Sequence, residues 1–282
     1  MVINRTSSEV KDRLWHKGVE FATYQARKLL QESGITSPPF LPERLAALRG
    51  IKILKEDLGN LDSLLLPLRD GFEIKINATH SPQRQNFSCA HEIAHTFFFD
   101  KDGQALRERL KRGAGEKVAK SWEEDLCDVV ASELLMPSQI YTKYAARYNF
   151  GIDSLIALSR AFSTSIIPTA LRLCDLNPRR CFLVYWARDN FQELNDVKLR
   201  AKWLTWSRMH LSSSTGRFLF NPKLSVRFSS LLKAYKSDIT TYSRERARVN
   251  NFIGDCQIWS QGFDSGSDRF VLSLLFPEQS DS

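Results

Sequence analysis

The 282-residue chain lacks the features that would place it in a membrane or outside the cell. No stretch approaches 18 uncharged apolar residues, the length that a membrane-spanning helix needs. Residues 1–6 do not provide the apolar core of a signal peptide. We therefore expect a cytoplasmic protein without a membrane partner.

Cysteine is scarce and follows no pattern. The five cysteines are Cys89, Cys127, Cys174, Cys181 and Cys256. None forms a C-x-x-C pair, so this odd set predicts reduced, buried thiols rather than a disulfide framework. We interpret Cys89, two residues before a histidine, as a core-packing residue. A nucleophilic role is not expected, because the motif offers it no base other than the two histidines assigned to the metal.

The chain also lacks a glycine-rich phosphate loop. Its formal charge is +8, from 40 basic and 32 acidic residues. Basic clusters occur at residues 107–112, 179–180 and 244–248, and the first is mixed in sign. A basic surface kept for solubility explains this spread better than a nucleic-acid partner, which we do not favour.

One motif carries specific chemistry. Residues 91–95 read His-Glu-Ile-Ala-His. On a helix, His91 and His95 project from one face and can bind one zinc ion, while Glu92 can act as general base on a water. The alternative is a helix with two surface histidines, or two core histidines satisfied by backbone carbonyls. Ser88 is a candidate helix cap.

A catalytic zinc site needs a third protein ligand. Residues 122–136 predict a second buried helix that stops at Pro137. Glu124 is the candidate ligand and Asp128, one turn later, the candidate partner of a histidine N–H. Glu123 competes with Glu124 by one position. The alternative is a solvated acidic helix start that suits the helix dipole.

These segments together resemble the ImmA/IrrE family of bacterial zinc metallopeptidases over roughly residues 20–175. The resemblance rests on Ile-Asn at 76–77, Arg-Gln-Asn-Phe at 84–87, the motif at 91–95, and the helix from Glu124 to Pro137. The first glutamate of the family's second helix falls on Glu124, and its Asn/Asp falls on Asp128. Cys127 replaces the usual Ala and Val130 the usual Phe, both in packing positions.

The resemblance implies a zinc endopeptidase that cleaves a helix-turn-helix transcriptional repressor in a regulatory or stress response. The ligands would be His91, His95 and Glu124, with Glu92 as the base and Asp128 behind a histidine. The alternative is a non-catalytic regulator that uses the zinc fold to bind protein or DNA. Candidate donors to the oxyanion are Tyr141, Tyr144, Tyr148 and His210.

The fold expectation is α+β. We expect a zincin-like metallopeptidase domain at 1–140 with a small antiparallel sheet and buried zinc helices, a helical segment at 141–178, and a C-terminal α+β domain at 179–282. The resemblance implies that this last domain is GAF-like, as a sensor or docking domain, although no residue signature marks it. Its aromatic residues are expected mainly in the core.

The local patterns of the N-terminal part predict helices at 8–33 and 42–50 and strands at 51–54, 63–67 and 71–77. An exposed edge strand there can pair with an extended peptide. Residues 99–121 read as a long polar loop, either a lid or disordered.

Farther along, helices are expected after Pro137 and at 153–173, where a turn at 163–165 resembles a helix-turn-helix. We favour a packing pair over DNA binding, because Ile166, Ile167 and Pro168 are poor base readers. The C-terminal part predicts strands at 181–187, 256–260 and 270–276 and helices at 198–211 and 224–235.

Overall fold

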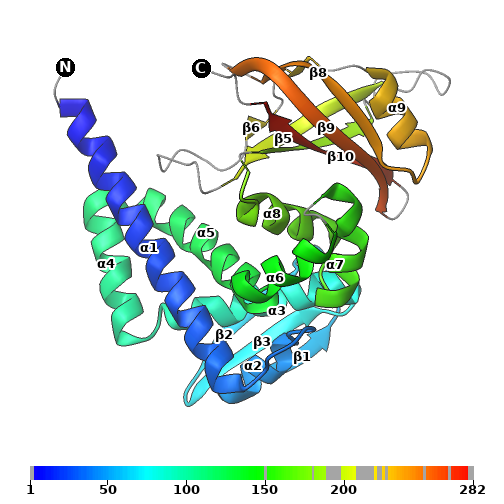
Figure 1. Cartoon of the computed structure of the whole chain (residues 1–282). Helices are drawn as coiled ribbons and strands as arrows, with labels where there is room; N and C mark the ends of the chain where they lie inside the picture. Colours follow the sequence, from blue (N-terminus) through cyan, green and yellow to red (C-terminus); the bar gives the residue numbers. More distant parts are fainter. Residues whose placement is uncertain are drawn as a thin grey trace. The chain divides into compact units, whose positions relative to one another are not determined.

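The computed structural model describes residues 3–148, 151–179, 181–188, 198–207, 219–220, 224–225, 228–249, 252–265 and 268–278. The chain divides into two compact units (Figure 1). The first comprises residues 1–141, 158–168 and 212–214, and the second comprises residues 142–157, 169–211 and 215–282. The division therefore crosses the helical segment. The domain boundaries expected at 140 and 178 stay a prediction.

Two helices open the first unit. Helix α1 covers Ile3–Ser33 and α2 covers Pro42–Leu48. Each is followed by a glycine with a positive φ, Gly34 at +65° and Gly50 at +66°, a conformation that L side chains rarely adopt. Both predicted helices are confirmed.

The sheet of the first unit has three strands in the order β1-β3-β2. They are β1 (Lys52–Glu56), β2 (Ser63–Leu68) and β3 (Gly71–Asn77). β2 and β3 form an antiparallel hairpin, but β1 is parallel to β3. The expectation of a purely antiparallel sheet is therefore wrong. The segment between β1 and β2 leads the chain to the opposite edge of the sheet. Strand β3 then lies between β1 and β2 and runs parallel to β1.

Helix α3 (Pro82–Phe97) packs against β2, β3 and α5 (Glu116–Leu135). It begins at Ser81, whose hydroxyl accepts a hydrogen bond from the N–H of Arg84, and Pro82 occupies the first turn. The prediction that Ser88 caps this helix is wrong, because Ser88 lies buried within it. The second predicted helix, α5, is confirmed and begins six residues earlier than expected.

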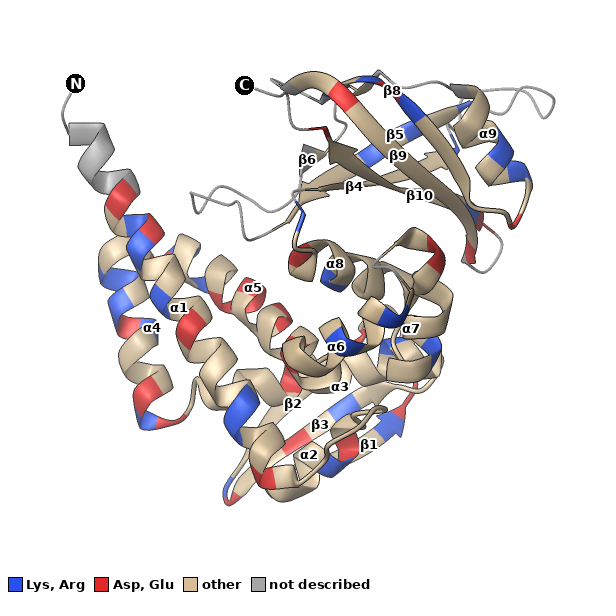
Figure 2. Cartoon of the chain, in the orientation of Figure 1, with Lys and Arg blue, Asp and Glu red and all other residues tan. Residues whose placement is uncertain are grey.

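Residues 101–114 form helix α4 (Lys101–Ala114), so the predicted loop is wrong. Its buried residues are Gly103, Leu106 and Leu110, a narrow stripe one turn apart. Charged residues of both signs cover the remainder of α4 and the exposed parts of α1 (Figure 2). Helix α4 packs against α5 and α1, and this tertiary packing stabilises a helix that the local composition alone does not predict.

A run of short helices follows. These are α6 (Ser138–Ala145), η1 (Ala146–Tyr148), η2 (Ile152–Ser154), α7 (Leu155–Phe162) and α8 (Ile166–Leu176). The helical pair α7–α8 is confirmed, and Ser163 in its turn has a φ of +52°. In the described ranges, no single helix is long and apolar enough to cross a membrane. Only the bent pair of Ile152–Phe162 and Ile166–Leu176 passes that test jointly, by length and composition.

The second unit contains a seven-stranded sheet in the order β6-β5-β4-β10-β9-β8-β7, and its recorded strand pairs are antiparallel. The elements are β4 (Phe182–Arg188), β5 (Leu199–Trp206), β6 (Leu219–Phe220), β7 (Leu224–Ser225), α9 (Phe228–Lys236), β8 (Thr241–Val249), β9 (Phe252–Ser265) and β10 (Asp268–Pro277). Helix α9 packs against β8, β9 and β10.

The three strands predicted in the C-terminal part are confirmed as β4, β9 and β10. The helix predicted at 198–211 is wrong, because residues 199–206 form β5, while 208–211 lie outside the described residues. The helix predicted at 224–235 begins only at Phe228. The α+β class is confirmed, and the GAF-like assignment stays a prediction. All five cysteines are buried thiols that take part in no disulfide, as expected.

Candidate metal centre

Helix α3 positions the two histidines of the motif. Ala90, Ile93 and Ala94 are fully buried and fix the helix on the core. His91 and His95, four residues apart, therefore face the same side, with ring centroids 4.9 Å apart. Their side chains are 19% and 18% exposed. The two histidines are therefore neither surface residues nor fully buried core residues.

Helix α5 brings Glu124 to the same point. The Nε2 atoms of His91 and His95 are 3.2 Å apart. Oε2 of Glu124 lies 3.3 Å from Nε2 of His91 and 3.5 Å from Nε2 of His95. The three atoms thus form a nearly equilateral triangle that combines residues from two helices.

The triangle has the dimensions of a tetrahedral zinc site. Zinc binds histidine nitrogen and carboxylate oxygen at about 2.0–2.1 Å, so two ligand atoms in a tetrahedron lie about 3.3 Å apart. The measured separations of 3.2, 3.3 and 3.5 Å agree with this value. The Glu124 side chain is 54% exposed, so the triangle opens toward solvent, as a site that admits water and substrate requires.

Asp128 lies behind His91. Its Oδ1 is 2.9 Å from Nδ1 of His91, the nitrogen that faces away from the triangle. Burial lowers the pKa of His91, but the hydrogen bond and charge of Asp128, with the charges of Glu92 and Glu124, outweigh it and raise the pKa. A carboxylate in this position fixes the ring and its tautomer, leaving Nε2 available to a metal.

Glu123 takes the corresponding place behind His95, which the sequence reasoning missed. Its Oε1 lies 3.8 Å from Nδ1 of His95, and both its oxygens are bound by Arg107 of α4. Burial opposes ionisation of Glu123, but His95 and Arg107 lower its pKa to about 2. Glu123 therefore stays charged and supports His95 instead of replacing Glu124 in the triangle.

The candidate base Glu92 is 8% exposed and is held by the sheet. The hydroxyl of Ser63, the first residue of β2, donates to Oε1 of Glu92 at 2.7 Å. This contact was also missed from the sequence, because 29 residues separate the two side chains. It orients the carboxylate beside the two histidines.

Cys127 lies close to the two histidines of the triangle. It is fully buried, and it places its sulfur within 4.8 Å of ligand atoms of His91 and His95. Oε2 of Glu124 is closer to both histidines, at 3.3 and 3.5 Å, so Glu124 fits the ligand position better. The burial of Cys127 agrees with the packing role expected for it.

The structure does not select one of the four candidate hydrogen-bond donors to the oxyanion. Tyr141 is fully buried, and its ring packs on Phe162 with centroids 5.1 Å apart. Tyr144 and Tyr148 belong to the second unit, and His210 lies outside the described residues.

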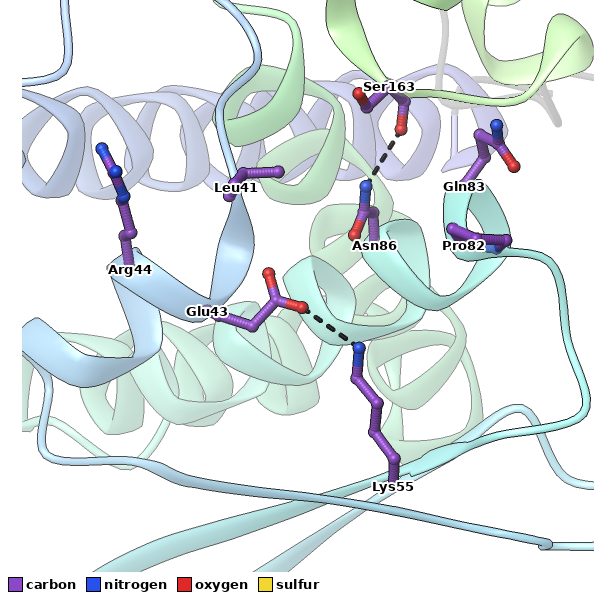
Figure 3. A pocket seen from close by; sticks show the side chains of 8 residues that line it. All are labelled: Leu41, Glu43, Arg44, Lys55, Pro82, Gln83, Asn86 and Ser163. Atoms are coloured by element: carbon purple, nitrogen blue, oxygen red, sulfur yellow. Dashed lines mark hydrogen bonds and ion pairs between the residues drawn. The ribbon is translucent and has the colours of Figure 1, made fainter.

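A separate pocket lies at the other end of α3 (Figure 3). It is lined by Leu41, Glu43, Arg44, Lys55, Pro82, Gln83, Asn86 and Ser163. An ion pair joins Glu43 to Lys55 at 3.4 Å, and the Asn86 amide donates to the Ser163 carbonyl at 3.1 Å. None of the histidines or carboxylates of the triangle lines it, so this pocket is distinct from the candidate centre.

Comparisons with known proteins cover this region. Residues 46–173 match the family model of the IrrE N-terminal-like domain, so the resemblance seen in the sequence is confirmed. The radiation response metalloproteases IrrE of Deinococcus radiodurans and Deinococcus deserti are similar, at 27% identity over 134 residues and 28% over 128 residues. The matches cover 48% and 45% of this chain and 40% and 44% of the relatives, so the chain spans less than half of their length.

Among the solved structures that match, one is similar over most of the chain. It is described as a Mycobacterium tuberculosis transcriptional regulator, and it matches with a TM-score of 0.59 over 94% of both chains. The sequence identity is 12%, so this likeness concerns the fold alone.

Proposed function

We propose that this chain is a zinc-dependent endopeptidase of the gluzincin type, because residues 46–173 match the family model of the IrrE N-terminal-like domain. The observation that carries the proposal is the triangle of His91, His95 and Glu124, whose three ligand atoms have the spacing of a tetrahedral zinc site. When bound, Zn²⁺ supplies a Lewis acid that polarises the substrate carbonyl and acidifies a water.

The chain's own residues supply the proton transfers. Glu92 takes the proton from the attacking water and delivers it to the leaving amine. Ser63 holds one oxygen of Glu92, so the second oxygen is the one that exchanges the proton. Asp128 and Glu123 keep the rings of His91 and His95 in place.

An extended substrate has a docking edge near this base. β2 is an edge strand in the order β1-β3-β2, and its first residue is the one that holds Glu92. A peptide that pairs with β2 through main-chain hydrogen bonds would pass close to the triangle. Leu64 and Leu68 on this strand are 37% and 52% exposed and offer apolar contacts to such a peptide.

The substrate class rests on the family. We propose a helix-turn-helix transcriptional repressor, cleaved in a regulatory or stress response in the cytoplasm. The second unit would then serve as a docking or sensing module, with the GAF-like character expected from the resemblance. Co-expression with the product of a neighbouring repressor gene tests this: intact repressor should disappear with the wild type and persist with Glu92→Gln.

Metal content tests the centre itself. We expect about one zinc per chain in the wild type and less than about a tenth of that in a His91→Ala/His95→Ala double variant. Glu124→Gln should lose most of the zinc, whereas Glu116→Gln, on the exposed first turn of the same helix, should keep it. Full zinc loading in the double variant would refute the proposed site.

The rival proposal is a non-catalytic regulator that uses this fold to bind protein or DNA. The formal charge of +8 supports this alternative, because a basic protein attracts nucleic acid. Glu92→Gln separates the two, because it removes the base and retains the metal ligands. If the biological effect survives Glu92→Gln, the binding role is correct. DNA affinity measured at several salt concentrations then shows whether phosphate contacts carry it.

A further inference from the structure

Two cysteines of the second unit are in contact. The sulfur of Cys174, in α8, lies 3.4 Å from the sulfur of Cys181, the residue before β4. Both side chains are fully buried. Each sulfur also faces the other residue's backbone, at 3.9 Å from the Cys181 carbonyl and 3.7 Å from the Cys174 carbonyl. The two cysteines thus contact each other through both their sulfurs and their backbone carbonyls.

The chain between them is anchored at several points. The N–H of Asn177 donates to the Cys174 carbonyl at 3.4 Å, and the side chain of Asn177 accepts from the N–H of Arg179 at 2.9 Å. The Cys181 carbonyl accepts from the N–H of Ser207, at the end of β5, at 3.1 Å. These bonds turn the chain back after α8 and hold the two thiols next to each other.

The other three cysteines are in different situations. Cys89, Cys127 and Cys256 lie in α3, α5 and β9, and all are buried. They differ from the pair in geometry. Among the cysteines, all of which lie in the described residues, the recorded contact between two sulfurs is that of Cys174 with Cys181, so a second thiol is in position to form a disulfide at that place.

We infer that Cys174 and Cys181 are a site of reversible oxidation, which a hydroperoxide converts to a disulfide. One sulfur attacks the peroxide oxygen and becomes a sulfenic acid, and the peroxide's second oxygen leaves as water. The second thiol then displaces the sulfenic hydroxyl as a second water and forms the S–S bond. Two thiols and one H₂O₂ thus give one disulfide and two waters, with two electrons passing to the peroxide.

The required movement is small. A disulfide has sulfurs about 2.05 Å apart, so the 3.4 Å contact must shorten by little more than 1 Å. Because both thiols are buried, a small neutral oxidant such as hydrogen peroxide suits the site. The bond would tie the end of α8 to the start of β4, where the IrrE-like segment ending at residue 173 gives way to the C-terminal sheet.

Trypsin offers a direct assay, because Arg172, Arg179, Arg180 and Arg188 flank or separate the pair. The full chain is reduced, freed of reductant, treated with H₂O₂ in the native state, then denatured, alkylated and digested. We expect peptides 173–179 and 181–188 to appear as one disulfide-linked species. Intact protein should carry three alkyl groups instead of five, and a reducing agent should restore all five.

Variants make the result specific. Cys174→Ala and Cys181→Ala should each abolish the linked species, whereas Cys256→Ala, a matched buried control, should retain it with two alkyl groups. Five alkylated cysteines after native treatment, with linkage only in denatured protein, would overturn the inference. A native linkage through Cys89, Cys127 or Cys256 instead would overturn it too. The readout is independent of zinc and of proteolysis.

Discussion

The hydroxyl of Ser63 and the carboxylate of Glu92 are joined by a hydrogen bond of 2.7 Å, which connects the edge strand β2 to helix α3. Glu92 is 8% exposed, so this donor contributes much of its local polar environment. The same strand is the edge at which we propose that an extended peptide docks. Under that proposal, Ser63 would couple the pairing of the substrate to the orientation of Glu92.

Removing that donor should slow proteolysis without removing the metal. A hydrogen bond to a charged group contributes about 1.5 kcal/mol, so Ser63→Ala should lower kcat about tenfold. KM should change less, because Ser63 is proposed to orient the base. Steady-state cleavage of the repressor identified by co-expression provides the measurement, with zinc content determined on the same samples.

Ser63→Thr is the matched variant, because it keeps a hydroxyl at the same position of β2. Its kcat should return to within about threefold of the wild type. An equal loss in both variants would point to a disturbed strand, and a change confined to KM would assign Ser63 to peptide binding.

The carboxylates behind the histidines should affect metal affinity unequally. Asp128 contacts His91 at 2.9 Å, whereas Glu123 approaches His95 only to 3.8 Å. Loss of such a partner typically weakens metal binding by about 10- to 100-fold, so we expect that range for Asp128→Asn and a smaller effect for Glu123→Gln. Zinc competition against a chelator of known affinity measures both.

Glu116→Gln controls for the loss of one negative charge on α5. It should bind zinc as the wild type does. If Glu123→Gln weakened zinc binding more than Asp128→Asn did, the support of His95 through Glu123 would be the stronger one, contrary to the distances.

Those parts of the candidate metal centre whose geometry depends on a single helix could be predicted from the sequence. The spacing of His91 and His95 is set by one helical turn, and the apolar periodicity of α3 and α5 marks both helices. Glu124 and Asp128 follow from the same periodicity on α5. The contacts of Ser63 and Arg107 could not be predicted, because the partners lie 29 and 16 residues away and only tertiary packing brings them together.

The errors in secondary structure have similar causes. Helix α4 carries only a narrow buried stripe of Gly103, Leu106 and Leu110 among many charges, so its composition is typical of a loop. In the C-terminal sheet, the pairing of β4 with β5 shifts register between Tyr185 and Trp186. This irregularity breaks the alternation of buried residues in β5 and made residues 198–206 read as helical.

Acid should destabilise the metal-free protein partly through Glu123. Its pKa is lowered from 4.5 to about 2 in the folded chain, so its contribution is present above pH 4.5 and lost as the pH falls toward 2. Integrated from pH 5.5 to pH 3, this linkage amounts to about 2 kcal/mol of unfolding free energy. Urea unfolding at the two pH values measures the loss.

The other carboxylates titrate in the same range, so the comparison with Glu123→Gln isolates this term. The variant should lose about 2 kcal/mol less than the wild type between pH 5.5 and pH 3. An identical loss in both proteins would show that Arg107 and His95 do not hold the Glu123 charge in solution.

The last prediction concerns how α4 is seated, since α4 carries Arg107. A Cβ added at Gly103 would lie 2.0 Å from the carbonyl oxygen of Phe97 and 2.7 Å from the Cα of Phe98, both backbone atoms. Gly103→Ala must therefore displace α4 from the end of α3. Overpacking of this kind costs about 1–3 kcal/mol, more than the roughly 1 kcal/mol that alanine gains over glycine within a helix.

Gly113→Ala on the same helix is the matched control, because its Cβ would meet Cδ1 of Leu14, the end of a side chain that can rotate away. Thermal unfolding should show a lower midpoint for Gly103→Ala and little change or a gain for Gly113→Ala. Gly103→Ala should also weaken zinc binding in the direction of Glu123→Gln, because Arg107 moves with the helix. A Gly103→Ala protein as stable as Gly113→Ala would contradict the close seating of α4 on α3.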